Sequence, residues 1–323
     1  MKILVTGAAG FIGFHLVQAL VKRTCTVVGI DNLNDYYDVT LKQARLAELT
    51  SHKNFDFRTI DLADRAAMAS LFEKEKFDRV IHLGAQAGVR YSIDNPFAYI
   101  DSNLVGTMTV LEGCRHSNVK HVLYASSSSV YGANTKIPFS VSDRVDHPVS
   151  LYAATKKSNE LMSETYARLY GLTLTGLRFF TVYGPWGRPD MAYFKFAQSI
   201  VAGKSIPVYN NGDMKRDFTY IDDIVSGILR ILDVGPEKLG LGLHKVYNLG
   251  NNKPEYLMDM ISMLERHMGQ EASKDFLPMQ PGDVYSTYAD IDDSVRDFGY
   301  APNIPLDEGL RRFVDWFKKF YKI

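Results

Sequence analysis

Two ionisable side chains, Tyr152 and Lys156, stand four positions apart in a segment with helical periodicity. Residues at this spacing share one face of a helix, so we expect the Lys156 ammonium to lie beside the Tyr152 phenol. A free phenol ionises at about pH 10, and a nearby positive charge favours phenolate, which makes Tyr152 a candidate base at neutral pH. Ser127, within the serine run 126–129 that follows a predicted strand, could share the proton. These residues predict proton transfer involving a hydroxyl group.

A glycine-rich turn, Gly7-x-x-Gly10-x-x-Gly13, joins a predicted strand to a predicted helix. Such a turn lets a pyrophosphate approach backbone N–H groups at a helix N-terminus. Asp31 ends the next predicted strand, where a carboxylate can bind both hydroxyls of an adenosine ribose and repel a ribose phosphate. The turn and the acid predict NAD rather than NADP. The alternative is a turn whose glycines only permit close packing.

The scaffold that positions these residues is predicted by alternation of short apolar strands with helical segments. This is the pattern of a parallel sheet covered on both faces. The predicted strands are 2–6, 26–30, 55–60, 79–83, 121–126 and 172–179, and the predicted helices are 11–22, 39–50, 65–74, 98–115 and 151–170. We therefore expect an α/β protein with a Rossmann-type, doubly wound parallel sheet.

Beyond about residue 183 the alternation fails, because glycine and proline break the chain into short pieces. A helix near 220–232 and a strand near 245–249 then resume the first pattern. We expect an NAD-binding domain of residues 1–180 with a returning segment of about 220–250. A smaller, mixed α/β lobe that binds substrate is expected from about 181–219 and 251–323.

Composition excludes several other classes of protein. The 37 Lys and Arg residues balance the 37 Asp and Glu residues, so no overall charge attracts nucleic acid or an anionic membrane. The only cysteines, Cys25 and Cys114, argue against a disulfide framework and are compatible with a reducing cytosol. The uncharged run 3–21 is interrupted by glycines, unlike a targeting segment. We expect a cytoplasmic protein with no membrane or nucleic-acid partner, and no metal site.

Two further stretches follow predicted strands, where ligands of parallel sheets collect. Asp61 could accept the adenine amino group, and the equal alternative is an N-cap for the helix that begins near Ala63. Small residues in the segment 83–86 leave room for a cofactor.

Together, the glycine turn, Ser127, the pair Tyr152 and Lys156, and the segment Arg216-Asp217-Phe218 resemble an extended short-chain dehydrogenase/reductase acting on a nucleotide sugar. The similarity covers essentially the whole chain. Four longer segments, 31–37, 126–131, 178–190 and 279–284, resemble the UDP-glucuronate 4-epimerases.

This resemblance implies bound NAD, a UDP-sugar substrate and a homodimer formed through two long helices. It implies Ser127, Tyr152 and Lys156 as catalytic residues. The implied cofactor contacts are Gly7, Gly10, Phe11, Ile12, Gly13, Asp31, Asn32, Asp61, Leu62, Leu83, Ala85, Gln86, Asn103, Ser126, Tyr152 and Lys156. The implied substrate contacts are Arg90, Ser127, Ser128, Ser129, Thr181, Arg188, Lys195, Val208, Tyr209, Arg216, Gln280 and Asp283.

Positions 128 and 129 distinguish reactions within the resembled family. Related 4,6-dehydratases have an Asp-Glu pair there, and decarboxylases of UDP-glucuronate typically have Glu at the second position. Both residues are serine in this chain, which favours epimerisation. Arg188 lies in a loop that can face the sugar and could hold a uronate carboxylate, the alternative being a solvated or interface arginine. Gln280 and Thr181 stand where many UDP-hexose epimerases have Arg and Asn.

The sequence thus predicts an NAD-dependent isomerase that inverts carbon 4 of UDP-glucuronate to give UDP-galacturonate, reversibly, through a 4-keto intermediate. The alternatives are a UDP-glucose or UDP-N-acetylglucosamine 4-epimerase, a UDP-glucuronate decarboxylase, and a non-catalytic NAD-binding sensor.

Overall fold

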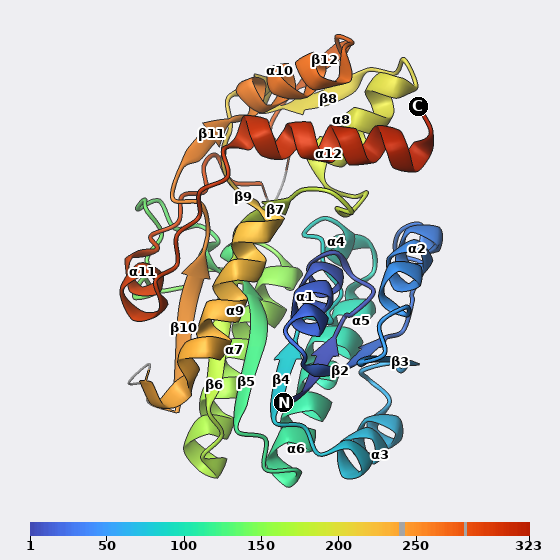
Figure 1. Ribbon diagram of the computed structural model, residues 1–323. Coiled ribbons are helices and arrows are strands. Elements are labelled where there is room, and N and C mark those ends of the chain that lie inside the picture. The colour runs from blue at the N-terminus through green and yellow to red at the C-terminus, as the bar shows by residue number, and fades with distance from the viewer. Residues whose placement is uncertain (239–242, 281–282) are drawn as a thin grey trace.

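The larger lobe is built on a seven-stranded sheet in which every neighbouring pair of strands is parallel. The computed structural model describes residues 1–238, 243–280 and 283–323 (Figure 1). The strand order is β10-β6-β5-β4-β1-β2-β3, which is the doubly wound arrangement predicted. The strands are β1 (Lys2–Thr6), β2 (Thr26–Asp31), β3 (Phe55–Thr59), β4 (Arg79–His82), β5 (His121–Ser127), β6 (Leu174–Phe179) and β10 (His244–Leu249).

Helices cover both faces of this sheet. The helices α1 (Phe11–Lys22), α2 (Val39–Leu49) and α9 (Ile221–Lys238) lie on one side, and α3 (Arg65–Glu75), α6 (Gly106–His116) and α7 (Leu151–Tyr170) lie on the other. Side chains alternate between the faces, so Ile3 and Val5 pack with α1 while Leu4 packs with α3 and α6. Burial on both faces explains the apolar runs at the centres of β1, β2 and β5.

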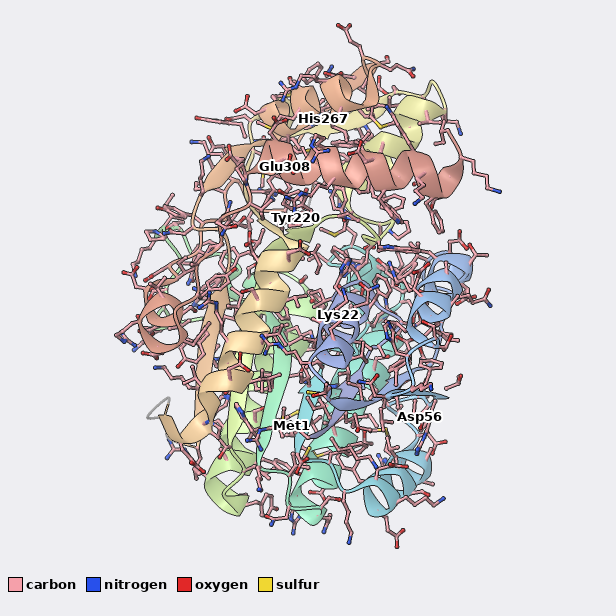
Figure 2. The ribbon with its side chains drawn as sticks, viewed as in Figure 1. Met1, Lys22, Asp56, Tyr220, His267 and Glu308 are labelled. Carbon is pink, nitrogen blue, oxygen red and sulfur yellow. The ribbon has the colours of Figure 1, made fainter. Side chains whose placement is uncertain are left out.

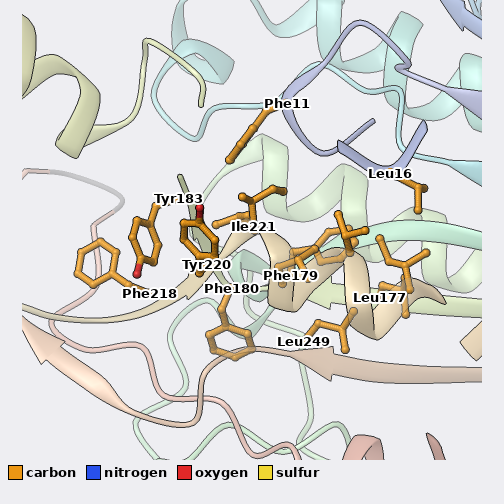
Figure 3. Packing of buried hydrophobic residues seen from close by; sticks show 14 of the residues in the cluster. Phe11, Leu16, Leu177, Phe179, Phe180, Tyr183, Phe218, Tyr220, Ile221 and Leu249 are labelled. Carbon is orange, nitrogen blue, oxygen red and sulfur yellow. The ribbon is translucent and has the colours of Figure 1, made fainter. Parts of the chain in front are cut away.

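The core on the α1 side continues into the second lobe. Leu16 and Leu177 belong to the same buried cluster as Tyr183 and Phe218, which lie on strands of the smaller lobe (Figure 3). The two lobes therefore share apolar packing, and the cavity described below lies at a well-packed junction.

The prediction of one helix over 98–115 was wrong. The chain instead forms α4 (Tyr91–Asp94), α5 (Pro96–Tyr99), the π-helical turn η1 (Ile100–Val105) and then α6. Pro96 begins α5 behind an Asn95 cap, because proline lacks the N–H that would continue α4. Apart from α9, which is longer than expected, the other predicted elements end within two residues of the observed bounds.

The smaller lobe combines two short sheets with three helices. One sheet has the order β11 (Pro254–Tyr256), β9 (Lys215–Tyr220), β7 (Thr181–Tyr183), and the other pairs β12 (Lys274–Leu277) with β8 (Ile206–Tyr209). The helices are α8 (Ala192–Val201), α10 (Leu257–Met268) and α12 (Leu306–Tyr321), whereas α11 (Asp292–Phe298) packs on β10 and α9. Tyr220, labelled in Figure 2 with Glu308, joins the lobes, and Arg312 of α12 lies 5.5 Å from its ring centre.

Within the described ranges, no helix combines the length and apolarity needed to cross a membrane. The same part of the chain contains no cluster of three or more His, Cys, Asp or Glu side chains suited to a metal ion. Cys25 and Cys114 are both buried and free.

Candidate active site

A cavity of about 970 Å³ lies outside the carboxyl ends of the parallel strands and extends to the smaller lobe. Ligands of doubly wound sheets bind in this position. The glycine turn lines one end, the serine run and Tyr152 line the middle, and Arg216 and Asp283 line the other end. Residues from both lobes therefore line one continuous cavity.

The glycine turn is shaped by backbone packing. Gly7 has a φ of +69°, and a Cβ there would lie 2.8 Å from the Gly84 nitrogen. A Cβ on Gly13 would lie 2.1 Å from the Gly7 carbonyl oxygen. Gly10 is the N-cap of α1 and provides no side-chain acceptor, so the first turn of the helix keeps N–H groups for a ligand. These features fit a dinucleotide pyrophosphate.

Two acidic residues lie beside the glycine turn. Burial raises the pKa of Asp31, while the nearby charge of Lys42 lowers it. Asp61 accepts a hydrogen bond from the Asn32 amide at 2.8 Å and another from the Ala63 N–H at 2.8 Å. The N-cap of α3 is Asp64 rather than Asp61, so the capping alternative for Asp61 was wrong. Both Asp31 and Asp61 line the cavity.

All the predicted cofactor residues line this cavity except Asn103. Its amide accepts from the Gln86 N–H at 2.8 Å and donates to the Gln86 carbonyl at 3.0 Å. The side chain is only 1% exposed, because the π-helical turn directs it toward the backbone of the segment after β4. The expected direct contact is therefore corrected: Asn103 holds Gln86, which itself lines the cavity.

The residues predicted to transfer a proton line the cavity near the carboxyl end of β5. Tyr152 lies in the first turn of α7, and the Ser150 hydroxyl caps this helix by accepting from the Ala153 N–H at 3.1 Å. Ser127 ends β5, and its hydroxyl oxygen accepts from the Ser129 hydroxyl at 2.9 Å. The short 3₁₀ turn η2 (Ser128–Tyr131) then presents Ser128 and Ser129 to the same cavity.

Charge around Tyr152 differs from the sequence expectation. Burial raises the pKa of Tyr152, and hydrogen bonding with Ser127 and the charge of Arg188 lower it. The Lys156 ammonium donates to the Ala125 carbonyl at 2.9 Å, and burial lowers its pKa to about 8. Lys156 and Arg188 both line the cavity with Tyr152, and the charge that lowers the pKa of the phenol is that of Arg188.

A buried ion pair holds the carboxyl end of β5 on the side away from the cavity residue Ser127. Glu160 accepts from Arg178 through two nitrogens at 2.8 and 2.9 Å, and it accepts from the Ser126 hydroxyl at 2.7 Å. Both charged side chains are 4% exposed. The pair fixes Ser126 one residue before Ser127, so the serine run is held by α7 and β6 together.

Arg188 is engaged by a carboxylate of its own loop. Its Nε donates to Asp190 Oδ1 at 2.9 Å, and its Nη2 pairs with Asp190 Oδ2. The Tyr36 hydroxyl also donates to Asp190, at 3.1 Å. The solvated alternative for Arg188 was wrong, because the side chain is three-quarters buried and pairs with Asp190.

The loop that carries Arg188 is attached to the NAD-side lobe by a buried arginine. Arg45 of α2 is 0% exposed and donates to the Ala9 carbonyl at 2.8 Å and to the Trp186 carbonyl at 2.6 Å. The His15 ring on α1 donates to the Pro185 carbonyl at 2.9 Å. The glycine turn and the Arg188 loop are thus joined through side-chain to backbone hydrogen bonds.

The far end of the cavity is lined by charged and aromatic side chains. Arg90 donates to Asp283 at 2.9 Å, and its guanidinium lies 4.7 Å from the centre of the Tyr209 ring. Arg216 donates to its neighbouring carbonyl, that of Lys215, at 2.8 Å. Burial lowers the pKa of Arg216, and Asp283 raises it. Two guanidinium groups beside an aromatic ring suit a diphosphate joined to a nucleobase.

Two predicted substrate residues lie outside the cavity lining. Val208 is 0% exposed, because alternation along β8 directs it into the core and turns Tyr209 toward the cavity. Gln280 contributes its carbonyl, which accepts from the Asp283 N–H at 3.2 Å, and is not among the described residues that line the cavity. The predicted residues Thr181 and Lys195 do line it.

Sequence reasoning missed four residues near the site: Tyr36, Lys42, Arg45 and Asp190. Tyr36 and Asp190 lie inside segments whose similarity to the family was noted, so those segments were the available signal. Arg45 carried no such signal, since a charged helix residue is usually solvated.

The chain belongs to the NAD dependent epimerase/dehydratase family, whose model matches residues 3–250. Protein CapI of Staphylococcus aureus is 52% identical over 334 residues, covering 100% of each chain. UDP-glucuronate 4-epimerase 2 of Arabidopsis thaliana is 48% identical over 334 residues, covering 100% of this chain and 77% of the relative. The UDP-glucuronic acid 4-epimerase from Bacillus cereus, solved with UDP-glucuronic acid and NAD, superposes with a TM-score of 0.91 at 36% identity, covering 99% and 100%.

Proposed function

We propose that this protein is an NAD-dependent isomerase that interconverts UDP-glucuronate and UDP-galacturonate by inverting carbon 4. The observation that carries the proposal is the meeting of Ser127, Tyr152 and Arg188 in one cavity, with serine at positions 128 and 129. The first two residues suit proton transfer at a sugar hydroxyl, and the arginine suits a carboxylate.

NAD is held in this proposal by the glycine turn, by Asp31 at the adenosine ribose, and by Lys156 beside Tyr152. The packed turn and the uncapped first turn of α1 fit this role. When bound, NAD supplies the hydride acceptor and donor for carbon 4 and a positive charge that favours tyrosinate.

Tyr152 removes the proton of the sugar 4-hydroxyl as hydride leaves carbon 4. Ser127 stabilises the shared proton, because it lines the same cavity as Tyr152 and its interaction with the phenol lowers the pKa of Tyr152. The 4-keto sugar then rotates so that hydride returns to the opposite face of carbon 4, and Tyr152 returns the proton to the oxygen. One acid–base group is sufficient, because the only exchangeable proton in the reaction is that of the 4-hydroxyl.

The serine pair separates this reaction from related ones. A 4,6-dehydratase needs an additional acid and base, and Ser128 and Ser129 supply neither carboxylate. A neutral-sugar epimerase would need no cation at the sugar, whereas Arg188 lines the same cavity as Tyr152 and Ser127. The position of Arg188 therefore favours a uronate over UDP-glucose.

The sugar nucleotide is bound in this proposal mainly by the smaller lobe. Arg216 and Arg90 neutralise the diphosphate, Tyr209 packs on the uracil, and Asp283 accepts from the ribose. Residues 1–180 and about 220–250 then serve as the NAD-binding domain, and about 181–219 and 251–323 as the substrate domain. The separate small sheets formed by β7, β9 and β11 and by β8 and β12 support this division, with α11 as an exception that packs on β10 and α9 of the larger lobe.

We also propose a homodimer in the cytoplasm. Met108 of α6 and Leu161 and Leu169 of α7 are 37%, 57% and 66% exposed on adjacent helices. Exposed apolar side chains in such a group favour packing against a second copy. Free buried cysteines are compatible with a reducing compartment.

The test is incubation of the purified protein with UDP-glucuronate and separation of the products. We expect UDP-galacturonate without added NAD. Exclusive formation of UDP-pentose products would instead indicate a decarboxylase. Turnover of UDP-glucose alone would indicate a neutral-sugar epimerase. Absence of turnover with every UDP-sugar would indicate an NAD-binding sensor.

A further inference from the structure

We propose that Asp190 and Tyr36 are positioning residues that fix the Arg188 guanidinium and thereby set how rarely the 4-keto uronate loses carbon dioxide. This inference rests on the proposed function, since it concerns the fate of the ketone formed from UDP-glucuronate. It assigns a task to two cavity residues that take no part in the hydride or proton transfer.

The first support is the geometry of the guanidinium. Asp190 occupies the edge of Arg188 formed by Nε and Nη2, in a two-point contact that fixes the plane of the group. Among the described residues, these are the only hydrogen bonds of this guanidinium, so Nη1 is left for a second carboxylate. Asp190 therefore orients the arginine without using all of its donors.

The second support is the fixed position of Asp190 itself. The Tyr36 hydroxyl donates to Asp190 Oδ2 at 3.1 Å. The Tyr36 ring packs on Tyr91 with 4.7 Å between centroids, and a Cβ on Gly88 would lie 2.4 Å from the Tyr36 oxygen. Tyr36 thus fills a tight space between the β2–α2 connection and the segment after β4.

The third support is the anchored backbone of the loop. Arg45 binds the carbonyls of Trp186 and Gly187, and His15 binds the carbonyl of Pro185. Because three successive carbonyls before Arg188 are held, movement of Arg188 is confined to its side chain. Asp190 and Tyr36 restrict that remaining freedom.

The orientation matters because the ketone is a β-keto acid. If the C5–C6 bond aligns with the carbonyl π system, it breaks heterolytically, carbon dioxide leaves, and the electron pair enters an enolate over C4 and C5 that takes a proton at C5. A carboxylate held at a fixed angle by Arg188 keeps that bond out of alignment. A loosely held arginine permits alignment while leaving hydride transfer possible.

The experiment uses UDP-glucuronate labelled with ¹⁴C at carbon 6 and measures released carbon dioxide per UDP-galacturonate formed. We expect Asp190→Asn to raise this ratio by about tenfold, the equivalent of one charge-assisted hydrogen bond. Tyr36→Phe, which keeps the carboxylate, should raise it by roughly two- to fivefold. Tyr91→Phe is the matched control, because its hydroxyl accepts from Asn95 rather than contacting Asp190, and it should keep the wild-type ratio.

A purely structural role would lower kcat in both variants without changing the ratio, and that result would overturn the inference. The Tyr36→Phe result decides the question by itself if Asp190→Asn does not fold. If wild type forms UDP-galacturonate while both variants keep its ratio, only this inference fails. If wild type forms none, the proposed function fails and the inference with it.

Discussion

The two ends of the cavity are built in different ways. At the end proposed to bind NAD, shape comes from backbone: Gly7 and Gly13 pack against carbonyl and amide atoms with no space for a side chain. At the end proposed to bind the sugar nucleotide, long side chains such as Arg90 and Arg216 form the lining, and they come from elements far apart in the chain. A ligand common to a whole family suits the first construction, whereas a ligand that differs among relatives suits the second.

The largest effect is expected at Tyr152, where the two ends meet. Tyr152→Phe keeps the ring but removes the acid–base group, so kcat should fall by about 10³-fold or more, at the upper part of the range for general acid–base catalysis. Affinity for NAD and for UDP-glucuronate, measured by calorimetry, should remain near wild type. Retention of a tenth of the activity would rule out the assigned role.

Gly13→Ala tests the backbone-built end. Its Cβ would lie 2.1 Å from the Gly7 carbonyl oxygen, so the turn must move away from the position that binds pyrophosphate. We expect NAD affinity to weaken on the order of 100-fold, a cost of roughly 3 kcal/mol. Gly203→Ala is the control for glycine replacement outside the turn: nothing lies within 4 Å of its Cβ position, and although its φ of +61° strains alanine, NAD affinity should stay at the wild-type value. Unchanged NAD binding in Gly13→Ala would show that the turn is not the pyrophosphate site.

Arg216→Met tests the side-chain-built end. Loss of one charged hydrogen-bond donor to the diphosphate should raise KM for UDP-glucuronate by about 10- to 30-fold. NAD affinity should not change, because Arg216 lies at the opposite end of the cavity from the glycine turn. A parallel loss of NAD affinity would mean that the two ends are not independent.

Acid should lower the free energy of unfolding through His82. This side chain lies behind the glycine turn and hydrogen-bonds Thr6 and Thr107. Burial lowers its pKa from 6.5 to about 3, so between these values the unfolded chain binds a proton that the folded chain does not. Its contribution to stability is complete above pH 6.5 and falls by about 1.4 kcal/mol per pH unit below it.

The measurement is the urea midpoint of unfolding between pH 7 and pH 4. His82→Gln should reduce the number of protons taken up on unfolding by about one, and so flatten the dependence of the midpoint on pH. His116→Gln, at a side chain that is 67% exposed, should leave the pH dependence as in wild type. If the urea midpoint changes equally with pH in wild type and His82→Gln, the acid sensitivity comes from other groups.

The backbone-built end was the more predictable one. Glycine spacing and an acid after the second strand follow local rules, so the sequence predicted the turn and Asp31 at the cavity. Val208 was misassigned because the inward face of a short strand such as β8 depends on which element packs beneath it. Asn103 does not line the cavity because it lies within the π-helical turn η1, where its amide binds the Gln86 backbone.

Charge pairing was the other unpredictable element. Arg188 and Asp190 are two residues apart in a loop, and no periodicity rule indicates that their side chains meet. Lys156 is four residues after Tyr152, as expected, yet its ammonium reaches the Ala125 carbonyl on a neighbouring strand. Local spacing places a side chain on a face, but tertiary contacts decide which atom it reaches.

The path of the chain between its two sets of sheets has a mechanical consequence. The chain passes from one set of elements to the other after Phe179, after Tyr220, after Leu249, before α11 and again before α12. Lobes joined by one linker can swing apart as rigid bodies, whereas lobes connected at several places resist that motion. No single cut in the backbone would release either lobe intact, and we expect the two to unfold as one cooperative unit.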